Sequence, residues 1–331
     1  MNERYDVELR EYNTLNLNGT ADRFFTVFDE NELLNLFNSK LSPSDDFRVL
    51  GGGSNIWISS ESIPVVIQLN NKGVLIKKSG NMTYVNVKAG EEWPVFIDTL
   101  VSNGIGGLEA LSDIPGTVGA APIQNIGAYG VEVSDRIKYV KVFDISKCEF
   151  KIIKNKDCYF SYRNSIFKKQ TTLIVVEVAF EFEDDYVPSV KHLDVLKYLD
   201  DSDFTIENVS KSIKAIRKSK LPDPTCTPNA GSFFKNPIVT EDKLAQVKTI
   251  NGDVVFYELN NGYKISAAWL IEQSGWKGKL LNGIGMSPKH ALVLTNTSSS
   301  IDSRIDEYVA LVKNDVLKKF KVELEVEPVC W

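Results

Sequence analysis

The chain has 331 residues and a net charge of −6, with 43% apolar residues, 25% charged residues and a pI of about 5.3. This composition is typical of a globular protein with a large core, and at ~150 residues per domain it allows two or three domains. The acidic balance argues against a nucleic-acid partner, since such partners are held mainly by phosphate contacts to lysine and arginine.

The remaining bulk features concern membranes, metals and compartment. No apolar run reaches the ~18 residues of a membrane-spanning helix. The four cysteines are widely spaced and the chain has only two histidines, so a zinc module is excluded and a disulfide framework is disfavoured. The first residues, MNERYDVELR, are charged from the start and predict no secretory signal. We expect a cytoplasmic protein without a membrane partner or a metal site.

The first predicted domain covers residues 1–70. A predicted strand at 47–50 runs directly into the glycine cluster Gly51-Gly52-Gly53-Ser54-Asn55. The expected elements are strands at 24–28, 47–50 and 64–69 and a helix at 30–38.

The second predicted domain, residues 71–220, is richer in strands. Its last helix places Val209, Ile213 and Ile216 on one face, and it must end before the prolines at 222 and 224, because proline disfavours helix in the preceding residue. These prolines mark the predicted boundary of the last domain. The expected elements are strands at 82–88, 137–143, 150–153 and 173–182 and helices at 94–101 and 206–218.

The third predicted domain covers residues 221–331. Strands and helices do not alternate strictly, so a simple doubly wound sheet fits poorly and a mixed fold is expected. The expected elements are helices at 241–248, 266–273 and 301–320 and strands at 254–257, 291–295 and 322–327.

The most distinctive stretch is 114–130, IPGTVGAAPIQNIGAYG, which has four glycines and no formal charge. Glycine lets backbone N–H groups approach a ligand closely, and Gln124, Asn125 and Tyr129 add hydrogen-bonding side chains. The stretch is therefore either a tightly packed structural loop or a cradle for a phosphate or a planar cofactor.

Two common nucleotide-binding motifs do not fit the glycines. No glycine cluster is followed by the Lys-Ser or Lys-Thr of a P-loop, and the stretch that starts at Gly104 lacks the third glycine of a GxGxxG fingerprint. Two separate loops remain, 51–55 and 115–121, and each can offer several backbone amides to a pyrophosphate. They predict a dinucleotide that lies across a domain junction.

Nine motifs in order along the chain resemble those of the UDP-N-acetylenolpyruvoylglucosamine reductase family, the UDP-N-acetylmuramate dehydrogenases of peptidoglycan precursor synthesis. The resemblance is to the longer subtype, which has a lid insertion. The motifs are Asn13-Thr14, LGGGSN at 50–55, GLEALSDIPGTVGAAPIQNIGAYG at 107–130, YRNSIFK at 162–168, KLPDP at 220–224, NAGSFFKNP at 229–237, AAWLIEQ at 267–273, HALVLTN at 290–296 and LEVE at 324–327.

The resemblance implies an α+β fold: two FAD-binding subdomains of the vanillyl-alcohol-oxidase type, 1–70 and 71–220 with the lid near 184–205, and a substrate domain at 221–331. It implies FAD as cofactor and NADPH as reductant. The cofactor-binding residues that it implies are Gly51, Gly52, Gly53, Ser54, Asn55, Ile114, Pro115, Gly116, Thr117, Gly119, Ala120, Ala121, Gln124, Asn125, Gly127, Ala128 and Tyr129.

The implied reaction adds a hydride from reduced flavin N5 to C3 of an enolpyruvyl ether and a proton to C2, while the charge that develops on the substrate must be stabilised. Ser232 matches the family's proton donor, although a serine after glycine is usually a turn or N-cap residue. Arg163 would pair with the substrate carboxylate or lie against the flavin edge, unless it only forms a structural ion pair. Glu327 would polarise the carboxylate together with Arg163. Glu323 and Glu325 alternate with apolar residues in the same register as Glu327, so all three would point to one side of a strand. Glu327 could therefore instead belong to a solvated strand face.

The implied substrate is a UDP-amino-sugar enolpyruvyl ether, and a monomer is expected. Surface lysines and packed histidines are common, so each implied contact has an ordinary structural alternative. The implied substrate-binding residues are Tyr162, Arg217, Lys220, Lys235, Asn236 and His290.

Two departures from the family pattern stand out. His192 aligns with the family's lid tyrosine, with Tyr186 nearby. The family's usual arginine shortly after the catalytic glutamate is missing, and Pro328-Val329 occupies its place. Neither departure touches Ser232, so activity is expected to survive with altered substrate closure. The alternatives are a related FAD-dependent sugar or lactone oxidase and a non-catalytic flavin or nucleotide-sugar binding protein.

Overall fold

The computed structural model describes residues 1–188, 193–199, 204–298 and 305–331. The chain forms two compact units, and it passes from one to the other inside the glycine cluster, between Gly52 and Gly53. The predicted division at 70 and 220 stays a prediction. Unit 1 contains Met1–Val7, Thr20–Gly52 and Ser62–Arg217, and unit 2 contains Glu8–Gly19, Gly53–Glu61 and Lys218–Trp331.

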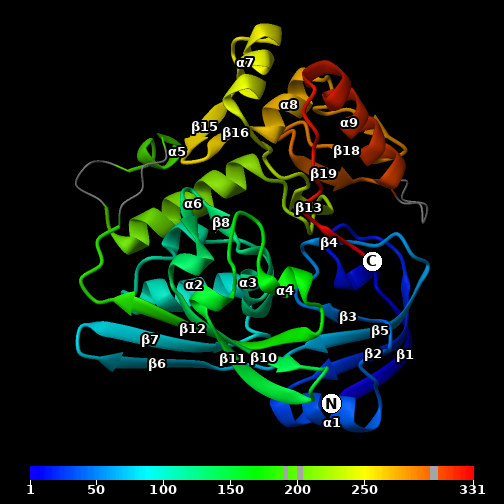
Figure 1. The fold of residues 1–331 in the computed structure, drawn as a ribbon, viewed down its shortest axis with the longest axis vertical. Coiled ribbons are helices and arrows are strands. Elements are labelled where there is room, and N and C mark those ends of the chain that lie inside the picture. Colours follow the sequence, from blue (N-terminus) through cyan, green and yellow to red (C-terminus); the bar gives the residue numbers. More distant parts are fainter. Residues whose placement is uncertain (189–192, 200–203, 299–304) are drawn as a thin grey trace. The chain divides into compact units, whose positions relative to one another are not determined.

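Unit 1 is built on two main sheets (Figure 1). A four-stranded sheet has the order β1-β2-β5-β3, with β5 parallel to both β2 and β3. A five-stranded antiparallel sheet has the order β11-β10-β12-β7-β6. The strands are β1 Asn2–Glu8, β2 Thr20–Val27, β3 Phe47–Leu50, β5 Ser62–Leu69, β6 Val74–Ser79, β7 Met82–Lys88, β8 Gly127–Ala128, β9 Val131–Glu132, β10 Ile137–Asp144, β11 Glu149–Lys154 and β12 Leu173–Glu183.

The helices of unit 1 pack apolar faces onto these sheets. In α1, the Asp29 carboxylate caps the first turn by accepting the Glu32 N–H at 2.8 Å, and Leu33 and Leu36 are buried in the core with strands β2 and β5. Figure 1 shows α2 and α3 on one side of the five-stranded sheet, where α2 buries Trp93 and Phe96. The helices are α1 Glu30–Ser39, α2 Trp93–Ser102, α3 Ala121–Gln124, α4 Ile166–Lys169, α5 Leu193–Leu196 and α6 Ile206–Lys220, whose last residues belong to unit 2.

The described part of unit 2 contains smaller sheets and three helices. The sheet orders are β13-β19-β18-β17 and β14-β16-β15, and β20 pairs in parallel with β4. Helix α9 buries Val312, Val316 and Phe320, and the Trp269 ring lies 5.3 Å from the Phe320 ring. The elements are β4 Ile56–Trp57, β13 Asn229–Ser232, β14 Ile238–Val239, α7 Glu241–Ile250, β15 Phe256–Leu259, β16 Gly262–Ile265, α8 Ala267–Gln273, β17 Leu280–Leu281, β18 Ile284–Met286, β19 Val293–Asn296, α9 Ile305–Phe320 and β20 Val329–Cys330.

Most predicted elements are confirmed, including the buried face of α6 formed by Val209, Ile213 and Ile216. The predicted strand at 322–327 is wrong: within the described part of the chain the segment forms no strand, and it pairs through an isolated bridge between Val326 and Phe234. The first four residues of the helix predicted at 301–320 lie outside the described residues.

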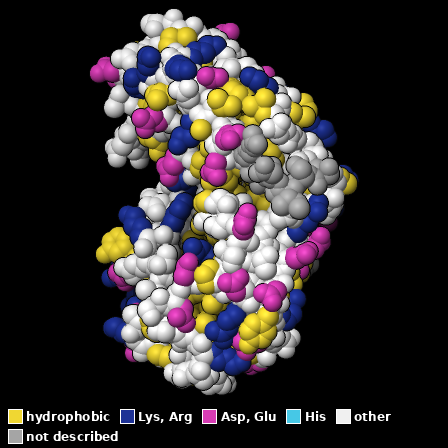
Figure 2. Space-filling view, turned by 90° about the vertical axis from the view of Figure 1, so that its right-hand side faces the viewer, with side chains coloured by type: hydrophobic (Ala, Val, Ile, Leu, Met, Phe, Trp, Pro, Cys, Tyr) yellow, Lys and Arg dark blue, Asp and Glu magenta, His cyan; other side chains and the backbone are white. Residues whose placement is uncertain are grey.

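The surface agrees with the composition. On the face shown in Figure 2, Lys and Arg side chains are interspersed with Asp and Glu side chains, as expected for the solvated surface of a slightly acidic protein. Among the described residues, no helix combines the length and the apolar composition that crossing a membrane requires.

Candidate functional site

The two glycine-rich loops meet in unit 1 at a cavity of about 370 Å³. Gly51 and Gly52 follow strand β3, and Pro115, Gly116 and Thr117 follow a short 3₁₀ turn. The residues that line the cavity are Gly51, Gly52, Gln68, Leu69, Asn70, Lys72, Gly90, Glu92, Pro94, Pro115, Gly116 and Thr117.

Glycine is required where the loops touch. A Cβ on Gly51 would lie 2.6 Å from Thr117 Oγ1, and a Cβ on Gly52 would lie 2.9 Å from the Cα of Gly116. Gly116 itself has φ +122°, which side chains rarely adopt. The part of the cavity wall where the two loops touch is therefore bare backbone, which suits the close approach of a phosphate to N–H groups.

The rest of the first glycine cluster belongs to unit 2. Gly53 has φ +66°, and a Cβ there would overlap the carbonyl oxygen of Tyr12. The Gly53 carbonyl accepts the Thr14 N–H at 3.1 Å, and the Asn55 carbonyl accepts the Val329 N–H at 3.0 Å. Ser54 and Asn55 are half-buried.

The remaining predicted cofactor residues of unit 1 lie on α3, β8 and the turns around them, and two of their side chains bond neighbouring segments of unit 1. The Gln124 amide oxygen accepts from Lys168 Nζ at 3.1 Å. Asn125 is fully buried with φ +45°, and it donates to Glu132 at 2.7 Å and to the Ser161 carbonyl at 3.2 Å. Those two side chains stabilise the loop itself. The others in this group are Ile114, Gly119, Ala120, Ala121, Gly127, Ala128 and Tyr129.

Arg163 is held against the same loop. Its Nη2 donates to the Gly127 carbonyl at 2.8 Å, and its guanidinium carbon lies 5.4 Å from the ring centre of half-buried Tyr162. The backbone of Arg163 is left-handed, with φ +53°. A left-handed non-glycine residue is uncommon and is a frequent feature of functional sites.

Arg217 lies on the last turns of α6. Its Nε donates to the Asp113 carbonyl at 3.2 Å. Burial lowers the pKa of this guanidinium, and the nearby Tyr129 and Asp113 oppose that effect. The structure thus brings Arg217 close to two residues that border the 114–130 loop.

Ser232 ends strand β13 in unit 2, and its side chain is exposed. Gly231, which precedes it, has φ +64°, and the Asn229 amide oxygen accepts the Gly231 N–H at 2.9 Å. Asn229 is itself buried and donates to the carbonyls of Pro222 and Thr227. Asn229 therefore shapes the turn that presents Ser232, a role that the sequence analysis missed although the residue stands in the NAGSFFKNP motif.

Glu327 lies beside the strand that carries Ser232. Its N–H donates to the Phe233 carbonyl at 3.0 Å, while Phe234 bridges Val326. Glu323 and Glu325 are exposed, whereas Glu327 is half-buried. The three glutamates are therefore not equivalent members of one solvated face.

The predicted substrate residues of unit 2 fall into two groups. Burial lowers the pKa of half-buried His290, and the positive charges of Lys220 and Lys277 lower it further. The His290 Nδ1 accepts the Leu292 N–H at 3.3 Å. Glu272 opposes these shifts, so charges of both signs lie near His290.

In the second group, the side chains contact other parts of unit 2. Lys235 forms an ion pair with Glu325. The Asn236 amide oxygen accepts the Ala267 N–H at 2.9 Å at the start of helix α8. These contacts show how the two residues are held and leave a substrate role as a proposal.

The two lid candidates differ in what can be described. His192 lies outside the described residues. The Tyr186 hydroxyl donates to the buried Glu109 carboxylate at 2.9 Å, and the Tyr186 ring lies 5.1 Å from the Arg136 guanidinium carbon. Tyr186 is therefore tied to the body of unit 1.

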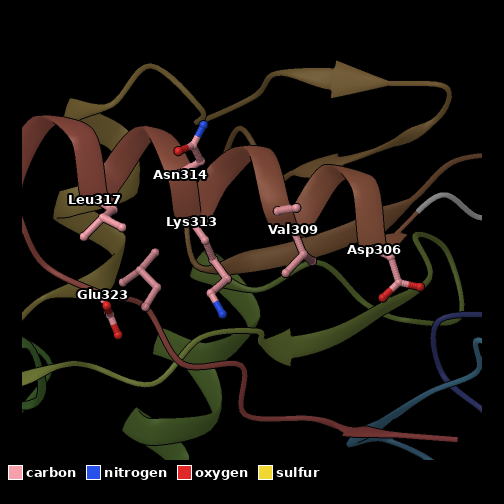
Figure 3. A pocket seen from close by; sticks show the side chains of 8 residues that line it. Asp306, Val309, Lys313, Asn314, Leu317 and Glu323 are labelled. Carbon is pink, nitrogen blue, oxygen red and sulfur yellow. The ribbon is translucent and has the colours of Figure 1, made fainter.

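Another cavity, of about 520 Å³, lies in unit 2 along one face of α9. Figure 3 shows Lys313 and Glu323 pointing into the space beside the helix and Asp306 near its first turn. Among the described residues that line it, none is a predicted site residue.

The class of the protein follows from the fold and the glycine-lined cavity. Residues 22–149 match a family model described as an FAD binding domain, and this range contains every residue that lines the cavity. The bare backbone walls fit the diphosphate of that cofactor. The protein is an FAD-dependent oxidoreductase with an α+β fold.

The comparisons then give the family. Residues 223–331 match the model of the UDP-N-acetylenolpyruvoylglucosamine reductase C-terminal domain. The enzymes of that name from Bdellovibrio bacteriovorus and Neisseria gonorrhoeae are each 38% identical to this chain over 98% of its length, covering 98% and 96% of theirs. A solved UDP-N-acetylenolpyruvylglucosamine reductase from Thermus caldophilus shares the fold, with a TM-score of 0.66, 23% identity and coverage of 100% of this chain and 98% of the other. The chain belongs to the UDP-N-acetylenolpyruvoylglucosamine reductase family.

Proposed function

We propose that the protein reduces the enolpyruvyl ether of UDP-N-acetylglucosamine to the lactyl ether of UDP-N-acetylmuramate in peptidoglycan precursor synthesis, with NADPH as the reductant. The substrate double bond gains a hydride at C3 and a proton at C2, and NADPH becomes NADP⁺. The chemistry that FAD supplies when bound is hydride transfer, from NADPH in one half-reaction and to the substrate in the other.

Ser232 is the proposed proton donor to C2. The observation that carries this assignment is the left-handed turn at Gly231, fixed by buried Asn229, which presents an exposed serine hydroxyl at the end of β13. A serine hydroxyl is a weak acid, so it can protonate only a strongly basic carbon. Exposure to solvent lets the resulting alkoxide regain its proton from water.

Glu327 and Arg163 are proposed to act on the substrate carboxylate. Arg163 offers a planar fork of donors, which matches a carboxylate in two places. Half-buried Glu327 is held next to Ser232 by the Phe233 hydrogen bond, so its position is coupled to that of the proton donor. Electrostatic stabilisation of developing charge contributes ~3 kcal/mol per donor in comparable sites.

The cations Lys220, Lys235 and Arg217, with Asn236, Tyr162 and His290, are proposed to bind the nucleotide-sugar. Phosphate oxygens need charged or amide donors, and charge-assisted bonds to lysine or arginine are the stronger kind.

The experiment separates the two half-reactions. In the absence of oxygen, NADPH should bleach the absorbance near 450 nm, and the enolpyruvyl nucleotide should restore it. In Ser232→Ala, bleaching should keep its rate while recovery slows by ~10² or more, as expected for loss of a general acid. Ser79→Ala, at the exposed end of strand β6, is the matched control. Recovery with oxygen alone would refute the reductase, and equal slowing of both phases would refute the role of Ser232.

A further inference from the structure

Two turns that the sequence analysis did not single out complete the glycine-lined cavity. One is the turn after β5, with Asn70 and Lys72, and the other is the turn after β7, with Gly90 and Glu92. Lys72 and Glu92 are the charged residues among those that line the cavity in the described chain.

These turns are fastened to each other. A Cβ on Gly90 would lie 2.7 Å from the Asn71 backbone nitrogen. Asn71 is buried, and its amide oxygen accepts the Gly90 N–H at 2.9 Å while its amide nitrogen donates to the Val176 carbonyl at 2.8 Å. Lys72 directly follows this fixed residue, so the start of its side chain is well defined.

The turns are also fastened to the second glycine loop. The Trp93 N–H donates to the Gly116 carbonyl at 2.9 Å, and the Gly119 N–H donates to the Ala89 carbonyl at 2.8 Å. The Lys72 ammonium donates to the Gly90 carbonyl at 2.5 Å, which uses one of its three protons and holds the charge at the cavity wall.

We propose that Lys72 binds the diphosphate of FAD, as the cation that supplements the backbone amides of the two glycine loops. The diphosphate carries two negative charges, and Glu92 adds another at the same cavity. Lys72 offsets part of this repulsion, while Glu92 opposes binding. This inference rests on FAD being the cofactor, and it assigns a role to a residue outside the family motifs quoted above.

The test measures release of FAD from the holoenzyme by the rise in free flavin fluorescence after dilution. Lys72→Met should release FAD roughly tenfold faster, the effect expected for one charge-assisted contact at a partly exposed site. Lys72→Arg should restore most of the retention. Glu92→Gln should slow release, because a like charge is removed. Lys77→Met, which changes an exposed lysine of β6 away from the cavity, is the matched control.

Salt provides a second readout that a purely structural role would not move. Release from the wild type should accelerate with added NaCl more steeply than release from Lys72→Met, since the charge pair that salt screens is absent in the variant. Equal release from Lys72→Met and Lys77→Met, or equal salt slopes in Lys72→Met and the wild type, would overturn the role of Lys72 while leaving the flavoprotein assignment intact. A wild-type protein that holds no FAD would instead overturn the premise.

Discussion

Gly52→Ala tests whether the two glycine loops act as one cradle. The added Cβ would lie 2.9 Å from the Gly116 Cα, and ordinary contact begins at 3.4 Å. The loops would have to separate by about 0.5 Å, and because the atom they meet is backbone, no side-chain rotation can relieve the contact. Overpacking of this kind costs ~1–3 kcal/mol. If the cost falls on the cofactor complex, FAD affinity drops ~5- to 150-fold.

Gly252→Ala is the matched control. Like Gly52, Gly252 does not have a left-handed backbone, and a Cβ added there would meet nothing within 4 Å. Its substitution should be neutral or stabilise by up to ~1 kcal/mol. The assay is fluorescence titration of FAD together with the thermal midpoint at saturating FAD. If Gly52→Ala keeps wild-type affinity and melts like Gly252→Ala, the close contact between the loops is not a determinant of cofactor binding.

Two further predictions concern charge and thiols. Hydrogen bonds from Lys40 and Arg23 lower the pKa of Glu3 from 4.5 to about 2, so these contacts should stabilise the fold above pH 4.5 and lose that effect as the pH falls towards 2. The melting temperature of Glu3→Gln should therefore depend less on pH in that range than the melting temperature of the wild type. An equal pH dependence of the two melting temperatures would contradict this prediction. Burial raises the pKa of Cys158 to about 12, whereas Cys226 and Cys330 are exposed. A colorimetric thiol reagent should therefore modify Cys226 and Cys330 rapidly and Cys158 only after unfolding. Rapid modification of Cys158 in the folded protein would contradict its burial.

The sequence predicted most periodic elements because their apolar patterns match what each face buries. It also predicted that both glycine loops line one site, since bare, uncharged backbone is costly on an ordinary surface. The position of Lys72 at the cavity could not be predicted from the sequence. It depends on the hydrogen bond between Asn71 and Gly90, and no local pattern in the sequence indicates that pairing.

The type of a side chain predicted its role in the site less well than the glycine pattern predicted the path of the backbone. Gln124 and Asn125 were expected to face a cofactor because of their amides, and that stays a prediction. In the structure their side chains bond Lys168 and Glu132, which lie outside the loop. The alternation at 322–327 predicted a full strand, but a strand needs a partner along its length. Among the residues that the structure describes, Phe234 pairs with Val326 alone in this segment. Burial then separated Glu327 from Glu323 and Glu325, which the alternation alone could not do.

The internal hydrogen bonds of Asn125 have a consequence for how the cofactor loads. We expect a loop whose left-handed corner is buried and bonded to Glu132 and Ser161 to be folded before any ligand arrives. Ligand capture by such a loop needs little ordering of the chain, so the entropic penalty of association is small. Cofactor uptake should then proceed in a single kinetic phase whose rate rises linearly with FAD concentration, as for a rigid receptor.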